Sequence, residues 1–379
     1  MIRVLVVDDS AVIRRVVTDV LNEDPEIEVV GTAINGKVAL DKVHDLQPDL
    51  ITLDVEMPEM DGLAMLSALR VNYRRVPVIM FSSLTEKSAA ITIEALARGA
   101  SDYVTKPAGQ GNLANAMASV RAELVPKVKA LCSRPNMRTG GSHAPHPTPA
   151  APLRPAPARA ATPTVPTPVP AGNAAAPASA RPRPQPGVVD IVAIGVSTGG
   201  PNALGQVLPR LKDLPVPVVI VQHMPPMFTK LLAEQLSNAT GIEVMEGKAG
   251  MTVEARKIYI APGDYHMVVK REGPYTKLDL NQGPPENSCR PAVDVLFRSV
   301  AQVYGNRALA VVLTGMGNDG EKGAVTLRDA GSQLIAQDQA TSVVWGMPGA
   351  VARAGLADQI LALGEIGTAI TSKVSRRGR

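Results

Sequence analysis

Short apolar runs alternate with helical patterns of apolar and polar residues through the first third of the chain. The runs have the length of strands, and several end in Asp, Ser or Lys. Strands that alternate with helices are typical of a parallel sheet covered by helices on both faces. We therefore expect an α/β fold that begins with five parallel strands, namely Val4–Val7, Val29–Ala33, Leu50–Leu53, Val78–Phe81 and Asp102–Thr105.

The same rhythm starts again after residue 188 and is interrupted in its middle. Pro262-Gly263 and Gly273-Pro274 separate short apolar runs, which suggests an antiparallel insertion or edge hairpin over residues 257–280. The second region is thus predicted to be a doubly wound α/β domain with an antiparallel hairpin. Its other expected strands are Val189–Ile194, Val216–Val221, Leu309–Leu313 and Gln333–Ala336, and its expected helices open at Pro201, cover Met227–Ser237 and follow Gly320.

A proline-rich segment separates these two regions. Residues 134–186 hold 15 of the 33 prolines and no aromatic residue, so this segment cannot bury a core. We expect a first domain over residues 1–125, a disordered Pro/Ala-rich linker over 126–187, and a second domain over 188–373.

The positive charge of the chain lies mainly in that linker. The net charge is +4, yet residues 127–183 contain 8 Lys or Arg and no Asp or Glu, so the folded regions are net acidic. Aromatic residues make up only 3% of the chain, which argues against a stacking platform for single strands. No nucleic-acid partner is expected, and a transcription factor is disfavoured because the second domain shows no helix-turn-helix pattern and no basic face.

The two cysteines and the apolar runs bear on the compartment. Cys132 and Cys289 lie far apart, without the spacing of a disulfide framework or a zinc site. The N-terminal apolar run is short, and no stretch of about 18 apolar residues occurs. We expect a cytoplasmic protein with no direct membrane insertion.

Polar side chains follow the predicted strands of the first domain. Asp8 and Asp9 follow the first strand, Asp54 the third, Ser82 the fourth and Lys106 the fifth. The carboxyl ends of parallel strands meet at one sheet edge, so these carboxylates should repel one another unless a divalent cation and an ammonium group offset them. The pattern predicts an Mg²⁺ site in which an aspartate can accept a phosphoryl group.

These residues stand in motifs that resemble the response-regulator receiver domain over residues 1–125. The motifs are Val-Asp8-Asp9-Ser, the segment Leu53–Gly62, Ser82-Ser83 and the segment Tyr103–Pro107. The resemblance implies that Asp54 is the phosphoacceptor and that a histidine kinase is the phosphodonor. The implied Mg²⁺ ligands are Asp8, Asp9, Asp54 and the backbone carbonyl of Glu56. Ser82 and Lys106 would contact the phosphoryl group, and Tyr103 would be the rotating aromatic of the switch.

A glycine-rich turn joins the first strand of the second domain to a helix. Residues 195–201 read Gly-Val-Ser-Thr-Gly-Gly-Pro, which fits Gly-x-Ser-x-Gly with proline at the start of the helix. A phosphate loop would need Lys where Pro201 stands, and a dinucleotide fingerprint needs a different glycine spacing. We interpret the turn as a nucleophile elbow that exposes Ser197. A packing turn or an anion-binding module without turnover remains an alternative.

A serine nucleophile needs a base and a carboxylate that orients it. His223 directly follows a predicted parallel strand, at the edge where Ser197 should lie, whereas His266 lies in the predicted hairpin. Asp319 also follows a parallel strand and is the favoured carboxylate, with Asp338 as its rival.

The order Ser, His, Asp differs from the order Ser, Asp, His of ordinary α/β-hydrolases. From residue 188 to about 370, the motifs are similar to the protein-glutamate methylesterase of bacterial chemotaxis. They are Ile194–Pro201, Val221–Met224, Ala261–Met267, Arg290–Phe297, Leu313–Gly320, Ala336–Asp338 and Met347-Pro348.

This second resemblance implies a phosphorylation-regulated serine hydrolase with the triad Ser197, His223 and Asp319. It would remove methyl groups from glutamate γ-methyl esters of chemotaxis receptors, release methanol and deamidate receptor glutamines, without a cofactor for the esterase. The backbone amides of Thr198 and Met316 are candidates for the oxyanion hole. We also expect the unphosphorylated first domain to restrain the esterase until Asp54 is phosphorylated. A receiver-controlled binding module without catalysis is the alternative.

Overall fold

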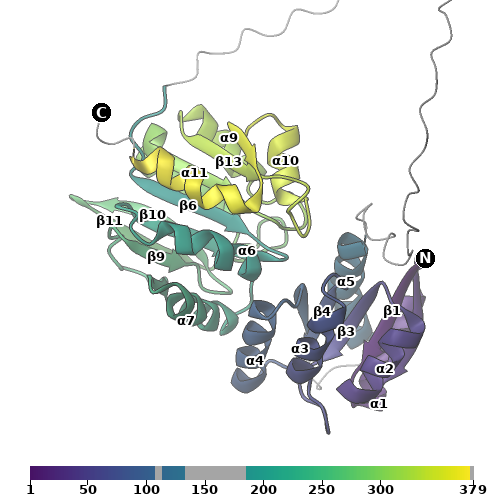
Figure 1. Cartoon of the computed structure of the whole chain (residues 1–379). Coiled ribbons are helices and arrows are strands. Elements are labelled where there is room, and N and C mark those ends of the chain that lie inside the picture. Colours follow the sequence, from purple (N-terminus) through teal and green to yellow (C-terminus); the bar gives the residue numbers. More distant parts are fainter. Residues whose placement is uncertain (107–112, 133–184, 376–379) are drawn as a thin grey trace, which may run out of the picture. The chain divides into compact units, whose positions relative to one another are not determined.

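The computed structural model describes residues 1–106, 113–132 and 185–375, which form two α/β domains, each with its own sheet (Figure 1). Most of the expected linker lies outside the described residues, and its first part, up to Cys132, continues helix α5. No helix in the described ranges is long and apolar enough to cross a bilayer.

The N-terminal domain is built on a five-stranded parallel sheet, as predicted, in the order β2-β1-β3-β4-β5. Successive residues of a strand point to opposite faces. Accordingly, Val4 and Val6 pack toward α1 and α5, whereas Leu5 and Val7 pack toward α2, α3 and α4. The elements are β1 (Ile2–Val7), α1 (Ala11–Asn22), β2 (Ile27–Ala33), α2 (Gly36–Leu46), β3 (Leu50–Asp54), α3 (Gly62–Asn72), β4 (Val78–Ser82), α4 (Glu86–Ala97), β5 (Asp102–Thr105) and α5 (Leu113–Cys132).

The C-terminal domain contains a seven-stranded sheet in the order β14-β13-β12-β6-β7-β9-β8, with every pairing parallel. The first part comprises β6 (Ile191–Val196), α6 (Gly200–Val207), η1 (Leu208–Leu211), β7 (Val218–Gln222), α7 (Phe228–Thr240), β8 (Glu243–Glu246), β9 (Lys257–Ile260), β10 (His266–Glu272) and β11 (Tyr275–Asn281). The second part comprises α8 (Val293–Tyr304), η2 (Gly305–Arg307), β12 (Ala308–Val312), α9 (Glu321–Asp329), β13 (Gln333–Gln337), α10 (Met347–Arg353), β14 (Gln359–Leu361) and α11 (Leu363–Ser375).

One strand lies elsewhere than the sequence suggested. Only β10 and β11 form the antiparallel hairpin, and the expectation that Lys257–Ile260 belongs to it is wrong. This segment is β9, which pairs in parallel with β7 and β8. Ile258, Tyr259 and Ile260 are all buried, as in a strand that helices or hairpins cover on both faces.

Helices cover both faces of this sheet. Val192 and Ile194 of β6 pack in one apolar cluster with α6, α7 and α11, whereas Ile191 and Ala193 pack in another with α8, α9, α10 and the hairpin. The carboxyl ends of β6, β7 and β12 therefore open onto the same edge, because these three strands are parallel neighbours.

Candidate functional site

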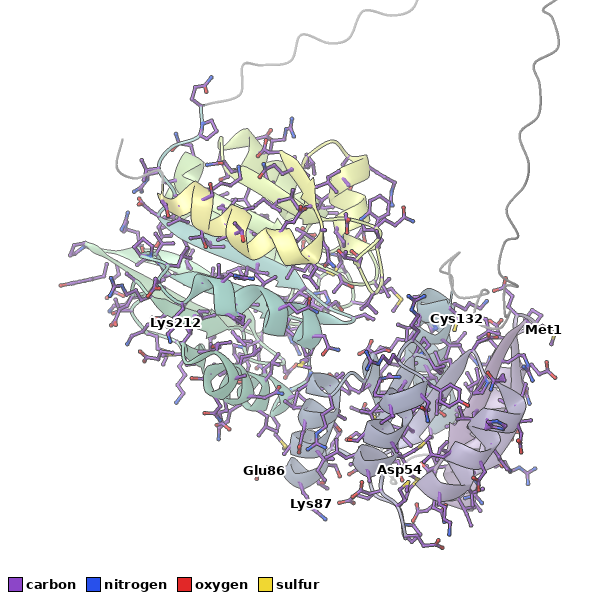
Figure 2. All side chains as sticks on the ribbon, in the orientation of Figure 1. Met1, Asp54, Glu86, Lys87, Cys132 and Lys212 are labelled. Atoms are coloured by element: carbon purple, nitrogen blue, oxygen red, sulfur yellow. The ribbon has the colours of Figure 1, made fainter. Side chains whose placement is uncertain are left out.

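The N-terminal domain gathers three carboxylates and one lysine at the carboxyl ends of its strands. Asp8 and Asp54 are buried, and Lys106 Nζ lies 2.9 Å from Asp8 Oδ2 and 2.8 Å from Asp54 Oδ2. Asp54, labelled in Figure 2, also accepts a hydrogen bond from the Val55 N–H at 2.7 Å. The helix that follows can begin so close to this strand only because residue 62 is glycine, since a Cβ there would lie 2.0 Å from the Asp54 carbonyl oxygen.

The carboxylate oxygens of this site suit a hard cation. One oxygen each of Asp8, Asp9 and Asp54 lies within 4.8 Å of the others. Burial, with a further contribution from the Asp8 charge, raises the pKa of Asp54 to about 6 despite the Lys106 ammonium. One lysine thus does not fully offset burial and the Asp8 charge, and oxygen donors in this arrangement fit Mg²⁺.

The other residues expected at this site are placed as follows. The Ser82 hydroxyl donates toward the carbonyls of Ser83 and Ser88 and accepts from Thr92 Oγ1 at 2.8 Å, so it faces α4. Glu56 forms an ion pair with Lys87 at 3.0 Å through its side chain, which leaves its backbone carbonyl separate from that pair. Tyr103 lies on β5, and its carbonyl accepts a hydrogen bond from Lys127 Nζ at 2.6 Å.

In the C-terminal domain, Ser197 lies in the turn between β6 and α6. Gly199 has φ of +75°, in the left-handed region that glycine adopts without strain. The Ser197 N–H donates to the Thr314 carbonyl at 3.0 Å, and the Gly200 N–H donates to the Ser197 carbonyl at 2.7 Å. These bonds hold the turn that the sequence predicted as a nucleophile elbow.

A glutamine that the sequence analysis did not identify connects this turn to the next strand. Gln222 is buried at the end of β7, and its Nε2 donates to the carbonyls of Ser197 at 3.1 Å and His223 at 3.2 Å. Because one amide group binds both carbonyls, the backbones of Ser197 and His223 are held at a fixed separation.

His223 contacts the carboxylate that was favoured from the sequence. His223 Nε2 lies 2.7 Å from Asp319 Oδ2, and both side chains are largely buried. The Val293 N–H and Asp294 N–H, at the start of α8, donate to Asp319 at 2.6 and 3.0 Å. Since α8 has no side-chain N-cap of its own, the Asp319 carboxylate satisfies its first amides.

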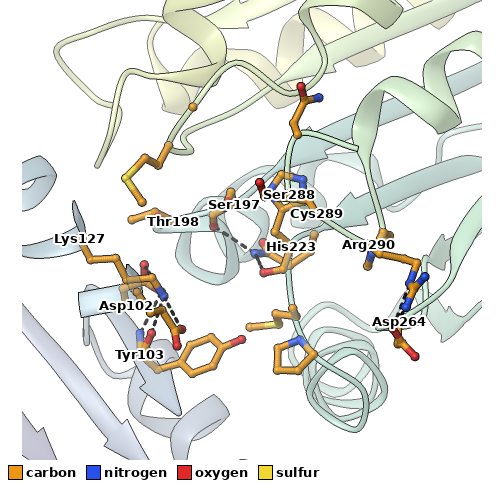
Figure 3. Close-up of a pocket in the computed structure, with 18 of the residues that line it drawn as sticks. Asp102, Tyr103, Lys127, Ser197, Thr198, His223, Asp264, Ser288, Cys289 and Arg290 are labelled. Carbon is orange, nitrogen blue, oxygen red and sulfur yellow. Dashed lines mark hydrogen bonds and ion pairs between the residues drawn. The ribbon is translucent and has the colours of Figure 1, made fainter. Parts of the chain in front are cut away.

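The other imidazole nitrogen faces a thiol. His223 Nδ1 lies 3.6 Å from Cys289 Sγ, and within the described chain no hydrogen bond joins it to Ser197 Oγ. Ser197, His223 and Cys289 line the same pocket, as Figure 3 shows. Burial disfavours the imidazolium, but the Asp319 carboxylate and the Cys289 sulfur outweigh it and raise the pKa of His223 to about 9.

The rival candidates have other partners. Buried His266 accepts the Ala292 N–H at Nδ1 (3.2 Å), and its Nε2 lies 3.0 Å from the Pro284 carbonyl, so both ring nitrogens hold the segment before α8. Asp338 Oδ1 accepts the Thr341 N–H at 2.9 Å within a turn. Within the described residues, no hydrogen bond joins the side chain of either residue to the Ser197 turn.

Two further residues that the sequence analysis missed come from one tight turn. The Glu286 N–H donates to the Cys289 carbonyl and the Cys289 N–H donates to the Glu286 carbonyl, with Asn287 and Ser288 at positive φ. This turn directs Asn287 to Asp319 and Cys289 to His223. The only sequence signal is Asn followed by Ser between polar residues, which indicates a turn but not what it contacts.

The chain matches two families of known proteins. Residues 4–118 match the response regulator receiver domain and residues 192–370 match the CheB methylesterase family. It is 49% identical over 376 residues to a protein-glutamate methylesterase/protein-glutamine glutaminase of Nocardioides sp., covering 99% of this chain and 96% of that one. A protein of the same name from Trichodesmium erythraeum is 46% identical over 98% of this chain and 99% of its own. The crystal structure of the Thermotoga maritima CheB methylesterase catalytic domain is 42% identical, with a TM-score of 0.48, and covers 48% of this chain and 98% of that one.

Proposed function

Because this chain belongs to the protein-glutamate methylesterase/protein-glutamine glutaminase family, with a receiver domain before the esterase domain, we propose that it acts on chemotaxis receptors. It hydrolyses glutamate γ-methyl esters to glutamate and methanol, and glutamine side chains to glutamate and ammonia. Ser197 is the nucleophile, His223 the base and Asp319 the residue that orients the base. The observation that carries this assignment is the 2.7 Å contact between His223 and Asp319, beside the turn that holds Ser197.

The arrangement of the two ring nitrogens determines the direction of proton transfer. Asp319 occupies Nε2, so Nδ1 is the nitrogen that receives the proton of Ser197 Oγ. Ser197 Oγ then forms a bond to the ester carbonyl carbon, and the protonated imidazole gives its proton to the departing methoxide, which leaves as methanol. His223 then takes a proton from water, which attacks the acyl-enzyme, and returns a proton to Ser197 Oγ as the glutamate product leaves.

Two backbone amides are suited to the oxyanion. Within the described chain, neither the Thr198 N–H nor the Met316 N–H donates to another group. Both residues line the pocket with Ser197. Free amide donors next to a nucleophile stabilise the charge that develops on the carbonyl oxygen, which supports Thr198 and Met316 as the oxyanion hole.

The N-terminal site supports regulation by phosphorylation at Asp54. An Mg²⁺ ion would be held by Asp8, Asp9, Asp54 and the Glu56 carbonyl. Its positive charge would offset the negative charge of the phosphoryl oxygens. Lys106, already 2.8 Å from Asp54 Oδ2, would bind the same group, and Ser82 would turn from α4 to join it. A chemotaxis histidine kinase is the proposed donor.

Methanol release from methylated receptor tests both parts of this proposal. Ser197→Ala should abolish it, and a fluorophosphonate probe should label the parent but not this variant, because only an activated serine reacts. Addition of Mg²⁺ with a small phosphodonor should raise the parent's rate. A parent that binds receptor but neither reacts with the probe nor releases methanol would instead be a binding module.

A further inference from the structure

A second buried carboxylate lies next to the proposed triad and has no role in the steps above. Asp294, in the first turn of α8, is completely buried. Its Oδ1 accepts the Gly323 N–H at 2.7 Å, and its Oδ2 accepts Asn287 Nδ2 at 2.9 Å. The same Asn287 Nδ2 also donates to Asp319 Oδ1 at 2.9 Å. One amide group therefore bridges two buried carboxylates.

The amide can lie only one way round. An ionised carboxylate can accept hydrogen bonds but cannot donate them. The NH₂ group of Asn287, with its two protons, must therefore face the two carboxylates. Asn287 is held for this purpose in the left-handed region, with φ of +51°, which Asn tolerates better than most residues. The bidentate ion pair of Glu286 with Arg298, at 2.8 and 2.5 Å, fixes the turn from the other side.

The two acids differ in their surroundings. Asp319 accepts hydrogen bonds from four N–H groups besides His223, namely those of Val293, Asp294, Gly320 and Asn287. Burial raises the pKa of Asp294, whereas the bonds to His223 and the α8 amides outweigh burial and lower that of Asp319. The donors around Asp319 thus keep this carboxylate ionised beside its buried neighbour.

We propose that Asn287 and Asp294 are positioning residues for the esterase reaction that act through Asp319. Asp294 holds the Asn287 amide, and Asn287 holds Asp319 Oδ1, so that Oδ2 stays on His223 Nε2. Together with the backbone N–H groups of Val293, Asp294 and Gly320, this contact keeps the carboxylate from rotating away when the imidazole takes and returns the serine proton. This inference rests on the proposed role of Asp319 in the triad.

Removal of the Asn287 amide has a distinctive consequence. Asp319 remains ionised, because three backbone N–H groups and His223 still contact it. However, one donor fewer leaves more negative charge on the carboxylate that faces the imidazolium, which raises the pKa of His223. The acid limb of the pH–rate profile should therefore move to higher pH, an effect that a purely structural hydrogen bond would not have.

The test uses the full chain with methylated receptor and compares Asn287→Ala, Asp294→Asn and the double variant. Asn287→Ala should lower kcat about tenfold to hundredfold, as for loss of one hydrogen bond to a charged group, with KM unchanged and the acid limb shifted upward. Asp294→Asn leaves one acceptor oxygen for two donors, Asn287 Nδ2 and the Gly323 N–H, and should lower kcat less. The double variant should be no slower than Asn287→Ala, since both changes interrupt the same chain of contacts.

Asn306→Ala is the matched control, because Asn306 Nδ2 also donates a hydrogen bond, to the Gln185 carbonyl at 2.9 Å, away from the triad. A folded Asn287→Ala enzyme with the parent's kcat and pH profile overturns the inference. If Asn287→Ala does not fold, Asp294→Asn tests the inference instead, and a kcat like that of the parent in this variant also overturns it. Asp319→Asn, measured alongside, separates the two levels: full activity in that variant would refute the triad itself.

Discussion

Each of the two domains places a buried aspartate near the carboxyl ends of the strands of its own parallel sheet, but the pKa values of these two aspartates are shifted in opposite directions. Asp54 has one lysine and one backbone N–H as donors, lies near Asp8, and its pKa is raised to about 6. Asp319 has four N–H donors and an imidazole, and its pKa is lowered. The first carboxylate is short of positive charge, whereas the second is fully satisfied by the chain.

This difference fits the function proposed for each site. A pocket that accepts a phosphoryl group and a cation needs charge that only the ligands complete. A serine–histidine–aspartate triad needs its three side chains in position before the substrate binds, because catalysis depends on groups that do not have to reorganise. Both proposed sites lie at the carboxyl ends of parallel strands, and the number of donors around the carboxylate distinguishes one from the other.

The largest expected effect comes from removing a member of the completed site. His223→Gln should lower methanol release about 10⁴-fold or more, because His223 is the one imidazole among the described residues that line the pocket with Ser197, and triad members act as a unit. His44→Gln, at an exposed position on α2, is the control and should have the parent's rate. Turnover of His223→Gln within tenfold of the parent would show that His223 is not the base of a catalytic triad.

The next effect concerns the incomplete site. Asp54→Asn should reduce the stimulation by Mg²⁺ and a phosphodonor to none, because a carboxamide cannot form the acyl phosphate. The measurement is the ratio of esterase rates with and without the phosphodonor. Asp41→Asn, on the exposed side of α2, should keep the parent's ratio. Stimulation that survives in Asp54→Asn would place the phosphoryl group elsewhere.

The pH dependence should follow the raised pKa of His223. Only the neutral imidazole accepts the serine proton, so kcat/KM should rise about tenfold per pH unit from pH 7 and level off near the pKa of about 9. The stability supplied by the charged His223–Asp319 pair has the opposite trend. It is fully present below the ordinary histidine pKa of about 6.5 and is lost as pH rises through about 9. A flat rate between pH 7 and 9 would contradict this protonation state.

Much of this architecture could be predicted from the sequence, with physically intelligible exceptions. Apolar runs between glycines and acids predicted the five strands of the N-terminal sheet and the inner strands β6, β7, β12 and β13, because buried parallel strands are continuously apolar. Strands β8 and β14 escaped notice because they are the two edges of their sheet, short and partly exposed. The local sequence pattern of β9 predicts a strand but does not indicate which strands it pairs with or in which direction, so its parallel pairing with β7 and β8 could not be predicted.

The candidate site divides in the same way. Ser197, His223 and Asp319 each follow a strand, so topology alone predicts that they meet. Asn287 and Cys289 reach the site through a turn that folds back on it, and neither has a periodic or spaced partner in the sequence. Gln222 resembles any polar residue at a strand end until its two carbonyl acceptors are known.

The smallest effects separate the two domains by the rigidity of their turns. A Cβ at position 62 would meet the Asp54 carbonyl oxygen at 2.0 Å, whereas one at position 200 would meet Gln222 Oε1 at 1.9 Å. Backbone cannot move aside as a side chain can, so Gly62→Ala should destabilise the N-terminal domain by about 3 kcal/mol and Gly200→Ala the C-terminal domain by about 1 kcal/mol. Gly200→Ala should nevertheless lower kcat more, because a displaced Gln222 no longer fixes Ser197 against His223. Gly205→Ala, where a Cβ meets nothing within 4 Å, is the control in calorimetric unfolding, and equal losses at positions 62 and 200 would contradict the distinction.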